Sequence, residues 1–286
     1  MKKGNIPTVI IVLIFFAGLS LLLYPTFSNY WNFFRQSRAI ATYAEEVAEL
    51  DNNTYDEILS EADKYNKSLI NNDERFFMTD EQLKQYESIL NIAGNGVIGY
   101  IEIPSIDCYL PIYHGADESV LQIAAGHIAG SSLPVGGKGT HSVISGHRGL
   151  PSAKLFTDLN KVKTGDTFTI RVLDEVLTYE VDQILTVEPQ NIEALDIDEN
   201  NDYCTLVTCT PYGINTHRIL VRGHRIENTV NTDNVRIIAD AQRFDSIVTA
   251  FVFSSPFIFI ILLWLIIRAR KASRNNHLNI KFNIKG

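Results

Sequence analysis

The chain has 286 residues, of which 45% are hydrophobic, enough for one folded domain with extensions. Eight of the 25 basic residues lie at the two ends, so residues 24–246 hold 17 basic residues against all 33 acidic ones, a formal charge of −16. Such a surface repels polyanions, which argues against nucleic-acid binding.

Two apolar blocks lie at the ends of the chain. Residues 6–23 follow a pair of lysines and are just long enough to cross a bilayer. No small-residue cleavage site follows them, which favours an uncleaved anchor over a signal peptide. Residues 247–267 form the second block, and a basic run comes directly after it. The positive-inside rule then predicts that the tip 1–5 and the tail 268–286 are cytoplasmic and that residues 24–246 lie outside the cell.

Residues 24–94 are expected to form a helical extension. Apolar side chains recur there three and four positions apart, as in amphipathic helices. Thr79 and Gln82 form a capping-box pattern at the start of a short helix. The charged segment 71–78 interrupts the helical pattern and is expected to be a loop. The expected helices cover residues 31–50, 55–70 and 79–90.

Residues 95–228 change in character and consist of short β-branched runs separated by Gly, Pro, Asn and Asp. At least seven such runs at this spacing predict a mainly β domain, a closed or nearly closed barrel. Short helical insertions are expected at 119–125 and 153–159, and residues 229–246 are expected to be a linker. The expected strands are 97–103, 107–113, 141–145, 167–173, 176–187, 203–210 and 217–225.

The last two predicted strands form a β-hairpin around a turn-rich connector, residues 211–216. Cys209 ends the first strand and Arg218 opens the second. If the strands pair across the connector, Arg218 lies beside Cys209. Arg222 points to the same face, further from the loop. A thiol and a guanidinium at the mouth of a hairpin indicate chemistry.

The three cysteines are Cys108, Cys204 and Cys209, an odd number that leaves at least one thiol unpaired. Cys204 and Cys209 lie five apart in one predicted strand, so they face opposite sides and cannot bridge each other. A zinc site built from these two and His217 lacks the usual ligand spacing. No metal and no other cofactor is therefore expected.

A nucleophilic cysteine needs a base or an electrostatic partner, because a free thiol is mostly protonated at neutral pH. His147 has the most suggestive setting, since it follows a predicted strand and is flanked by glycines. His114 and His127 also stand next to glycines, and composition does not exclude them. His217 and His224 lie on the hairpin itself and are interpreted as structural positions.

Five longer motifs stand out in the predicted β domain: GYIEIP (99–104), LPIYHG (110–115), GHIAGSSLPVGG (126–137), SGHRGLPSAKLFTD (145–158) and TCTPYGINTHR (208–218). The hairpin run TLVTC followed by Arg218 resembles the sortase signature. Together with the longer motifs, from about residue 95 to 226, it resembles class C sortases, the pilin polymerases of Gram-positive bacteria. The two apolar blocks and the helical extension also fit that class.

The resemblance implies an eight-stranded sortase-type β-barrel in which Cys209 is the nucleophile, His147 the general acid/base and Arg218 the third member. The thiolate attacks the Thr–Gly carbonyl of an LPXTG-like sorting signal, and a Lys amine of a pilin subunit resolves the thioester. The implied partners are pilins or surface proteins with such signals. The implied enzyme is a transpeptidase of the cell membrane with its catalytic domain outside.

Many class C sortases carry a lid before the barrel, in which an Asp-Pro-aromatic motif covers the cysteine. The matching segment here has Asp73, Phe76 and Phe77 but no proline. Either Asp73 with Phe76 or Phe77 forms a variant lid, or the segment is only a charged loop between helices.

Three other functions are weighed against pilus polymerisation. A housekeeping-type sortase would use a peptidoglycan amine as acceptor. A papain-like protease would place its cysteine at a helix N-terminus with the histidine downstream, whereas Cys209 ends a predicted strand and His147 lies upstream. A non-catalytic adhesin or sensor would explain the apolar ends and the acidic surface. It gives no reason for Cys209, His147 and Arg218 to occur together.

Overall fold

The computed structural model describes residues 6–228. The chain divides into two compact units, Met1–Asn234 and Val235–Gly286, and all described residues belong to the first. Four expected segments lie outside the described residues: the tip 1–5, the linker 229–246, the second membrane span 247–267 and the basic tail 268–286.

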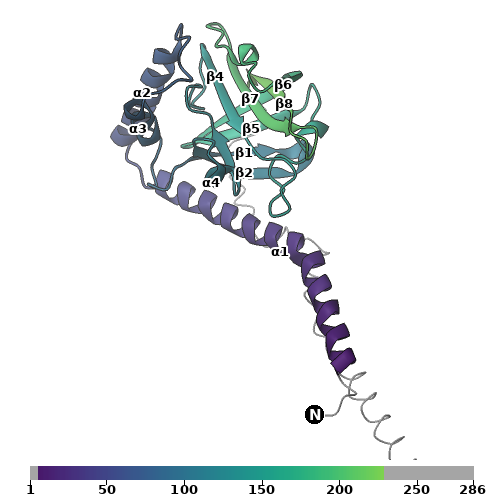
Figure 1. The fold of residues 1–286 in the computed structure, drawn as a ribbon. Helices are drawn as coiled ribbons and strands as arrows, with labels where there is room; N and C mark the ends of the chain where they lie inside the picture. The colour runs from purple at the N-terminus through teal and green to yellow at the C-terminus, as the bar shows by residue number, and fades with distance from the viewer. Residues whose placement is uncertain (1–5, 229–286) are drawn as a thin grey trace, which may run out of the picture. The chain divides into compact units, whose positions relative to one another are not determined.

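Eight strands form one closed barrel (Figure 1). They are β1 (Val97–Ile103), β2 (Cys108–His114), β3 (Ala125–His127), β4 (Thr140–Ser145), β5 (Thr167–Val172), β6 (Glu175–Val187), β7 (Asp202–Thr210) and β8 (His217–Ile226). Their order around the barrel is β1-β2-β3-β4-β7-β8-β6-β5. The β2–β3 and β4–β7 pairs are parallel and the others antiparallel. The closed barrel expected from the sequence is therefore confirmed.

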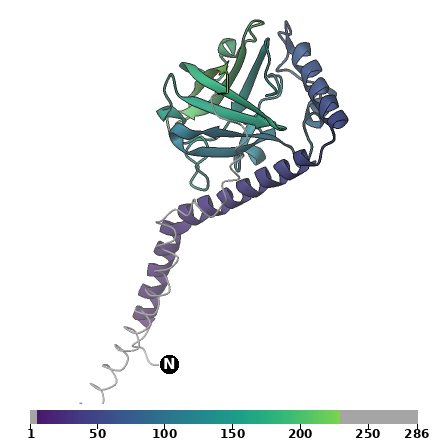
Figure 2. The ribbon, with the colours of Figure 1, turned by 180° about the vertical axis from the view of Figure 1, so that it is seen from behind.

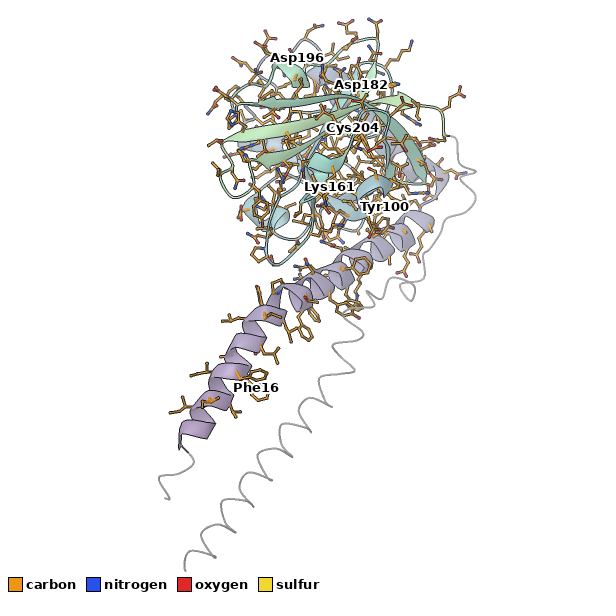
Figure 3. All side chains as sticks on the ribbon, turned by 90° about the vertical axis from the view of Figure 1, so that its right-hand side faces the viewer. Phe16, Tyr100, Lys161, Asp182, Asp196 and Cys204 are labelled. Carbon is orange, nitrogen blue, oxygen red and sulfur yellow. The ribbon has the colours of Figure 1, made fainter. Side chains whose placement is uncertain are left out.

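The barrel wall separates two apolar clusters, because successive residues of a strand face opposite sides. On β7, Cys204 and Leu206 belong to the main core, and Figure 3 shows Cys204 on the barrel wall. Val207 points the other way, into a smaller group that we call the outer-face cluster. This cluster consists of Val143, Leu195, Val207 and Leu220.

Three helices precede the barrel: α1 (Ile6–Ala48), α2 (Asn52–Leu69) and α3 (Asp80–Ser88). The expected anchor and the first expected helix form one continuous element, α1, which contains Pro25. A proline inside a helix removes a backbone hydrogen bond and bends it, and Figures 1 and 2 show α1 bent between its halves. Among residues 6–228, α1 is the one helix long and apolar enough to cross a membrane, a criterion that a signal sequence also meets.

Polar contacts attach α2 to the segment between β3 and β4, and α3 to β3 through the hydroxyl of Tyr86. Asn66 Nδ2 of α2 donates to Leu133 O at 3.0 Å, and Asn66 Oδ1 accepts from the Leu133 amide at 2.7 Å. The predicted capping box of α3 is present, with Thr79 and Gln82 bonded in both directions. Tyr86 of α3 is fully buried. The helical extension is therefore docked on the barrel.

Two expected helical insertions differ from the structure. The first is a single turn, α4 (Glu118–Leu121), and the end of the expected helix is strand β3. The second was expected at 153–159, which instead forms turns that lead into the 3-10 helix η2 (Leu159–Lys161). The expectation of a helix there is wrong because the segment folds back, so that the Phe156 amide donates to His147 O at 3.1 Å.

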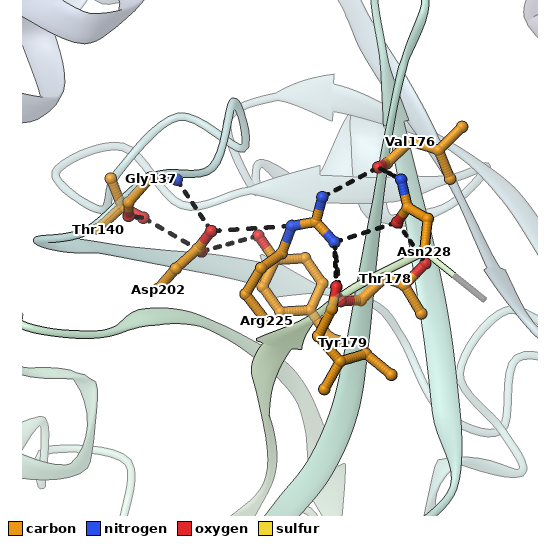
Figure 4. A network of polar contacts seen from close by, with 9 residues as sticks. Gly137, Thr140, Val176, Thr178, Tyr179, Asp202, Arg225 and Asn228 are labelled. Atoms are coloured by element: carbon orange, nitrogen blue, oxygen red, sulfur yellow. Dashed lines mark hydrogen bonds and ion pairs between the residues drawn. The ribbon is translucent and has the colours of Figure 1, made fainter. Parts of the chain in front are cut away.

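A polar network ties four strands together around Asp202, at the start of β7 and so at the opposite end of that strand from Cys209 (Figure 4). The Asp202 carboxylate accepts hydrogen bonds from Tyr179 Oη at 3.0 Å and from the Gly137 amide at 2.9 Å. Arg225 lies 4.0 Å from it. Because these groups satisfy one another, we interpret this end of the barrel as structural.

Candidate active site

Cys209 and Arg218 are direct cross-strand partners in the β7–β8 hairpin. The predicted proximity of this thiol and this guanidinium is therefore confirmed. Cys209 is a free, half-buried cysteine. Arg218 donates through Nη1 to the carbonyl oxygens of Asn215 and His217, each at 3.1 Å. These bonds fix the guanidinium at the mouth of the hairpin.

The two arginines on this face of β8 differ in their partners. Arg222 forms a bidentate pair with Asp182, at 3.0 and 3.1 Å, and stacks over the Tyr203 ring at 4.3 Å from its centroid. Within residues 6–228, no carboxylate forms an ion pair with Arg218. Arg218 therefore keeps donors for an external group, whereas the charge of Arg222 is matched within the fold.

Strand β4 delivers the next segment to the cysteine, because it runs parallel to β7. Past the end of β4, the Gly146 amide donates to Val207 O at 3.0 Å. The Thr208 hydroxyl donates in turn to Gly146 O at 2.7 Å. The chain after β4 thus stays beside β7 as far as Thr208.

A second bond continues this alignment past the candidate residues. Arg148 Nη1 donates to Thr210 Oγ1 at 3.3 Å. The residues between the two bonded pairs are His147 on one segment and Cys209 on the other. The alignment therefore places the backbone of His147 level with that of Cys209, and a Cys–His pair stays a prediction.

A close contact fixes the backbone just before His147. A Cβ atom on Gly146 would lie 2.5 Å from the Phe156 ring, which is completely buried. Only glycine fits here without displacing the ring. Since the Phe156 amide also donates to His147 O, residues 147–156 form a closed loop whose two ends are joined.

Glu118, at the start of α4, contacts the imidazole. Its Oε2 lies 3.2 Å from His147 Nε2. Hydrogen bonds from Gln122 and from His147 hold the pKa of the Glu118 carboxyl below its usual value. The sequence analysis missed this residue, and no local pattern marks it, because 29 positions separate it from His147.

The rival histidines are buried and already have partners. His127 contacts Tyr86 Oη through Nδ1 and Ser132 O through Nε2, both at 2.8 Å. Burial lowers the pKa of His127 to about 3, so it is neutral at physiological pH. His114 Nε2 lies 2.7 Å from Ile89 O. Both histidines serve the attachment of α3 to the barrel rather than the hairpin mouth.

The segment 71–78, which we call the lid loop, docks through a residue that the sequence analysis did not single out. Arg75 is only 7% exposed, and its Nη2 donates to Leu195 O at 3.0 Å and to Asp196 Oδ1 at 3.4 Å. A Cβ atom on Gly130 would lie 2.2 Å from Arg75 O. The backbone of the loop therefore rests directly on Gly130.

The three candidate lid residues have different surroundings. The Arg75 guanidinium carbon lies 4.5 Å from the centroid of the Phe76 ring, and Phe76 packs against the outer-face cluster. That cluster includes Val207, which shares a strand face with Cys209. Phe77 is 80% exposed and Asp73 is exposed as well. Of the three, Phe76 is thus the one that docks on the cysteine face of the sheet.

Comparison with known proteins gives a consistent result. A sortase-domain family model matches residues 101–226. Sortase C1 from Streptococcus agalactiae is 51% identical, with a TM-score of 0.63; the match covers 67% of this chain and 99% of that one. A sortase C from Clostridium perfringens, solved with a C-terminal cell wall sorting motif, is 44% identical over 67% of this chain and 99% of its own, with a TM-score of 0.58.

A curated relative is also a sortase. Sortase A of Streptococcus agalactiae is 34% identical over 128 residues, or 44% of this chain. This chain spans only 51% of the length of that protein. The shared part is therefore about half of the curated relative.

Proposed function

The chain belongs to the sortase family of cysteine transpeptidases, and from this premise we propose that it cleaves an LPXTG-like sorting signal and joins the product to a Lys amine of a pilin subunit. The observation that supports the proposal is the pairing of Arg218 with Cys209 at the mouth of the hairpin, together with the course of the His147 segment beside β7. Arg218 lies opposite Cys209 in the β7–β8 register, and the bonds on either side of His147 align it with Cys209.

The first half of the proposed reaction forms a thioester. The Cys209 thiolate attacks the carbonyl carbon between Thr and Gly of the signal, and the electron pair moves onto the carbonyl oxygen. Arg218 donates hydrogen bonds to that oxyanion, because its fork keeps donors that no carboxylate of the described residues occupies. When the tetrahedral intermediate collapses, the C–N bond breaks and the imidazolium of His147 protonates the leaving amine.

The second half transfers the acyl group. The amine of an acceptor Lys attacks the thioester carbonyl, and the neutral His147 takes up its proton. The C–S bond then breaks and the Cys209 thiolate is restored. One histidine thus acts first as acid and then as base, and the chain needs no other proton carrier for the cycle.

Membrane attachment is part of the proposal. Side chains on the first half of α1 are apolar and exposed, and Figure 3 shows Phe16 on the part of α1 away from the barrel. Exposed aromatic residues follow directly, as is typical of a lipid–water interface. They are Tyr24, Phe27, Tyr30, Trp31 and Phe34. We propose that α1 anchors an extracellular barrel, with residues 247–267 as a second span and both termini cytoplasmic.

We also propose that the lid loop restrains access to Cys209. The support is the position of Phe76 on the outer-face cluster, together with the buried anchor Arg75. The apolar side chains that Phe76 covers could otherwise receive the Leu and Pro of a sorting signal. Asp73 and Phe77 take no part in this docking in the described conformation, so the proposed lid consists of Phe76 and its anchor.

The activity is tested with a fluorescent LPXTG-type peptide and the full-length protein in detergent, with Cys209→Ala as control. Cleavage by wild type, and mass-spectrometric detection of an acyl group on the Cys209 peptide, are the expected results. Absence of any thioester, even after Phe76→Ala, would contradict the enzymatic proposal and favour a tethered adhesin or sensor.

A second candidate function has one observation in its favour, the similarity to a curated sortase A. An enzyme of that housekeeping type would use a peptidoglycan amine as acceptor. Supplying a Lys-bearing pilin and peptidoglycan amines in competition distinguishes the two. Pilin–peptide conjugates are expected, and exclusive transfer to the peptidoglycan amine would identify the housekeeping function.

A further inference from the structure

Two amides of α1 reach the barrel on either side of the candidate histidine. Asn32 Nδ2 donates to Ser152 O at 2.8 Å, and Gln36 Nε2 donates to Ile123 O at 2.6 Å. The acceptors lie 29 residues apart in the chain, in the loop after His147 and in the segment after α4. Asn32 and Gln36 are four apart, so they lie on one side of the helix, one turn from each other.

The Gln36 contact leads to His147 through α4. Ile123 follows the single turn of α4 and donates its own amide to Val120 O at 3.0 Å. The same turn begins at Glu118, whose carboxylate lies 3.2 Å from His147 Nε2. A four-residue helix has little stability of its own. Its position, and with it that of the Glu118 carboxylate, therefore depends on what holds its end.

The Asn32 contact leads to His147 through the closed loop 147–156. Ser152 lies within this loop, between the two ends that join at His147 O and the Phe156 amide. Asn32 thus holds the loop at a third point. Because backbone motion of a short closed loop is shared along it, this contact limits movement of the imidazole.

The chemistry of the two contacts goes beyond what packing alone requires. Gln36 is only 9% exposed, and a buried amide is favourable only when it is hydrogen-bonded. An apolar side chain would pack there without that constraint. A separate contact already fixes α1 to the barrel: Tyr43 Oη donates to Ile98 O at 3.0 Å and accepts from the Leu173 amide at 2.7 Å. That contact touches neither α4 nor the loop 147–156.

We infer that Asn32 and Gln36 are positioning residues, which hold the imidazole of His147 in place from α1 through α4 and the loop 147–156. This inference rests on the proposed function of His147 as acid and base. It assigns to the helix that carries the proposed membrane anchor an indirect part in assembling the site. The path through α4 reaches the imidazole by way of the Glu118 carboxylate, and the path through the loop 147–156 reaches the backbone oxygen of His147.

The test uses the full-length chain in lipid nanodiscs with the variants Gln36→Glu, Asn32→Ala and Asn32→Ala/Gln36→Ala. Gln36→Glu keeps the shape but removes the donor to Ile123 O. Tyr43→Phe is the matched control, because it weakens the docking of α1 without touching the two segments. Peptide transfer gives kcat and KM, and NMR of labelled histidine, assigned with His147→Gln, reports the imidazole of His147.

The double variant is expected to lower kcat about tenfold, since small misplacements of a catalytic group have such effects. KM should stay within about twofold, because neither side chain belongs to the outer-face cluster, on which we propose that the sorting signal binds. The His147 ring signals should shift or broaden in the double variant and stay in place in Tyr43→Phe. If the double variant does not fold, Gln36→Glu alone is compared with Tyr43→Phe.

Three results would overturn the inference: unchanged kcat in the variants, an equal loss of kcat in Tyr43→Phe, or His147 signals identical to wild type. Failure of the proposed function looks different. In that case wild type transfers no peptide at all, while the NMR comparison still decides whether α1 positions the imidazole.

Discussion

Arg218 lies directly opposite Cys209 on the last two strands of the barrel, whereas Arg222, on the same face, is bound to Asp182. Two arginines in equivalent orientations thus have different tasks. One is held by backbone carbonyls at the mouth of the hairpin, and the other forms a partly exposed ion pair with Asp182 of the neighbouring strand β6. This difference provides a matched pair of variants.

Replacing Arg218 by Lys should lower kcat/KM for peptide cleavage by about 10²-fold, because loss of an oxyanion donor has effects of this size. Lys keeps the charge but cannot reproduce the planar fork. Arg222→Lys is the control and should retain nearly full activity. It keeps its charge beside Asp182 and loses only the bidentate geometry and the stack on Tyr203, which costs about 0.2–1 kcal/mol of stability. Similar kinetic losses in both variants would show that the hairpin, and not Arg218 itself, is sensitive.

Much of the barrel follows from local sequence patterns. The hairpin 203–225 could be predicted with its register, because β-branched runs and a turn-rich connector leave few alternatives. The capping box at Thr79 is likewise local. Strand β3 could not be predicted, since its three residues are extended only because β2 and β4 pair with them. The turns at 153–159 also depend on a distant contact, the bond to His147 O.

The site divides in the same way. Cys209 and Arg218 could be found from one continuous stretch, and His147 from its setting and the family motifs. Glu118 and Gln36 carry no local signal, because each acts through contacts with parts of the chain that are distant in sequence. The proposed lid shows a further limit. Its aromatic residues make the segment a candidate from sequence alone, but no sequence pattern indicates that Arg75 is buried.

Replacing Phe76 by Ala should increase the rate at which a small thiol reagent labels Cys209, by a few-fold. The side chain packs on the outer-face cluster beside the cysteine, so its removal opens that face. Phe77→Ala is a matched control, since Phe77 is 80% exposed and should leave the rate unchanged. Arg75→Ala should act like Phe76→Ala, because it removes the anchor of the loop. Labelling rates equal to wild type in both would mean that the loop does not restrain access.

Acidification should destabilise the protein between about pH 6.5 and 4, through its buried histidines. Burial lowers the pKa of His127 to about 3 and that of His141 to about 4, whereas histidine in the unfolded chain titrates near 6.5. Between these values the unfolded state binds protons and the folded state does not. The contribution of these histidines to the free energy of unfolding is therefore fully present above pH 6.5. It is lost as the pH falls, by at most about 1.4 kcal/mol per pH unit for each histidine.

Urea unfolding in detergent from pH 7 to 4.5 measures this slope. His141 contacts Asp196 O through Nδ1 and Thr205 Oγ1 through Nε2, a donor–acceptor pattern that a Gln amide can imitate. In His141→Gln the free energy of unfolding should therefore depend less steeply on pH, because about one proton fewer is taken up on unfolding. An unchanged slope in this variant would assign the acid sensitivity to other groups.

A methyl group at position 146 should disturb both the fold and the site. In Gly146→Ala the new Cβ would lie 2.5 Å from the ring of Phe156, which is completely buried. Such overpacking costs about 1–3 kcal/mol of stability. Displacement of Phe156 also pulls its amide away from His147 O, so kcat should fall along with the melting temperature. The second change Phe156→Leu makes room for the methyl group, so the double variant should recover kcat and stability relative to Gly146→Ala. Thermal unfolding and peptide-transfer kinetics on the four proteins of this cycle measure the coupling, and purely additive effects would show that Gly146 and Phe156 do not act together on His147.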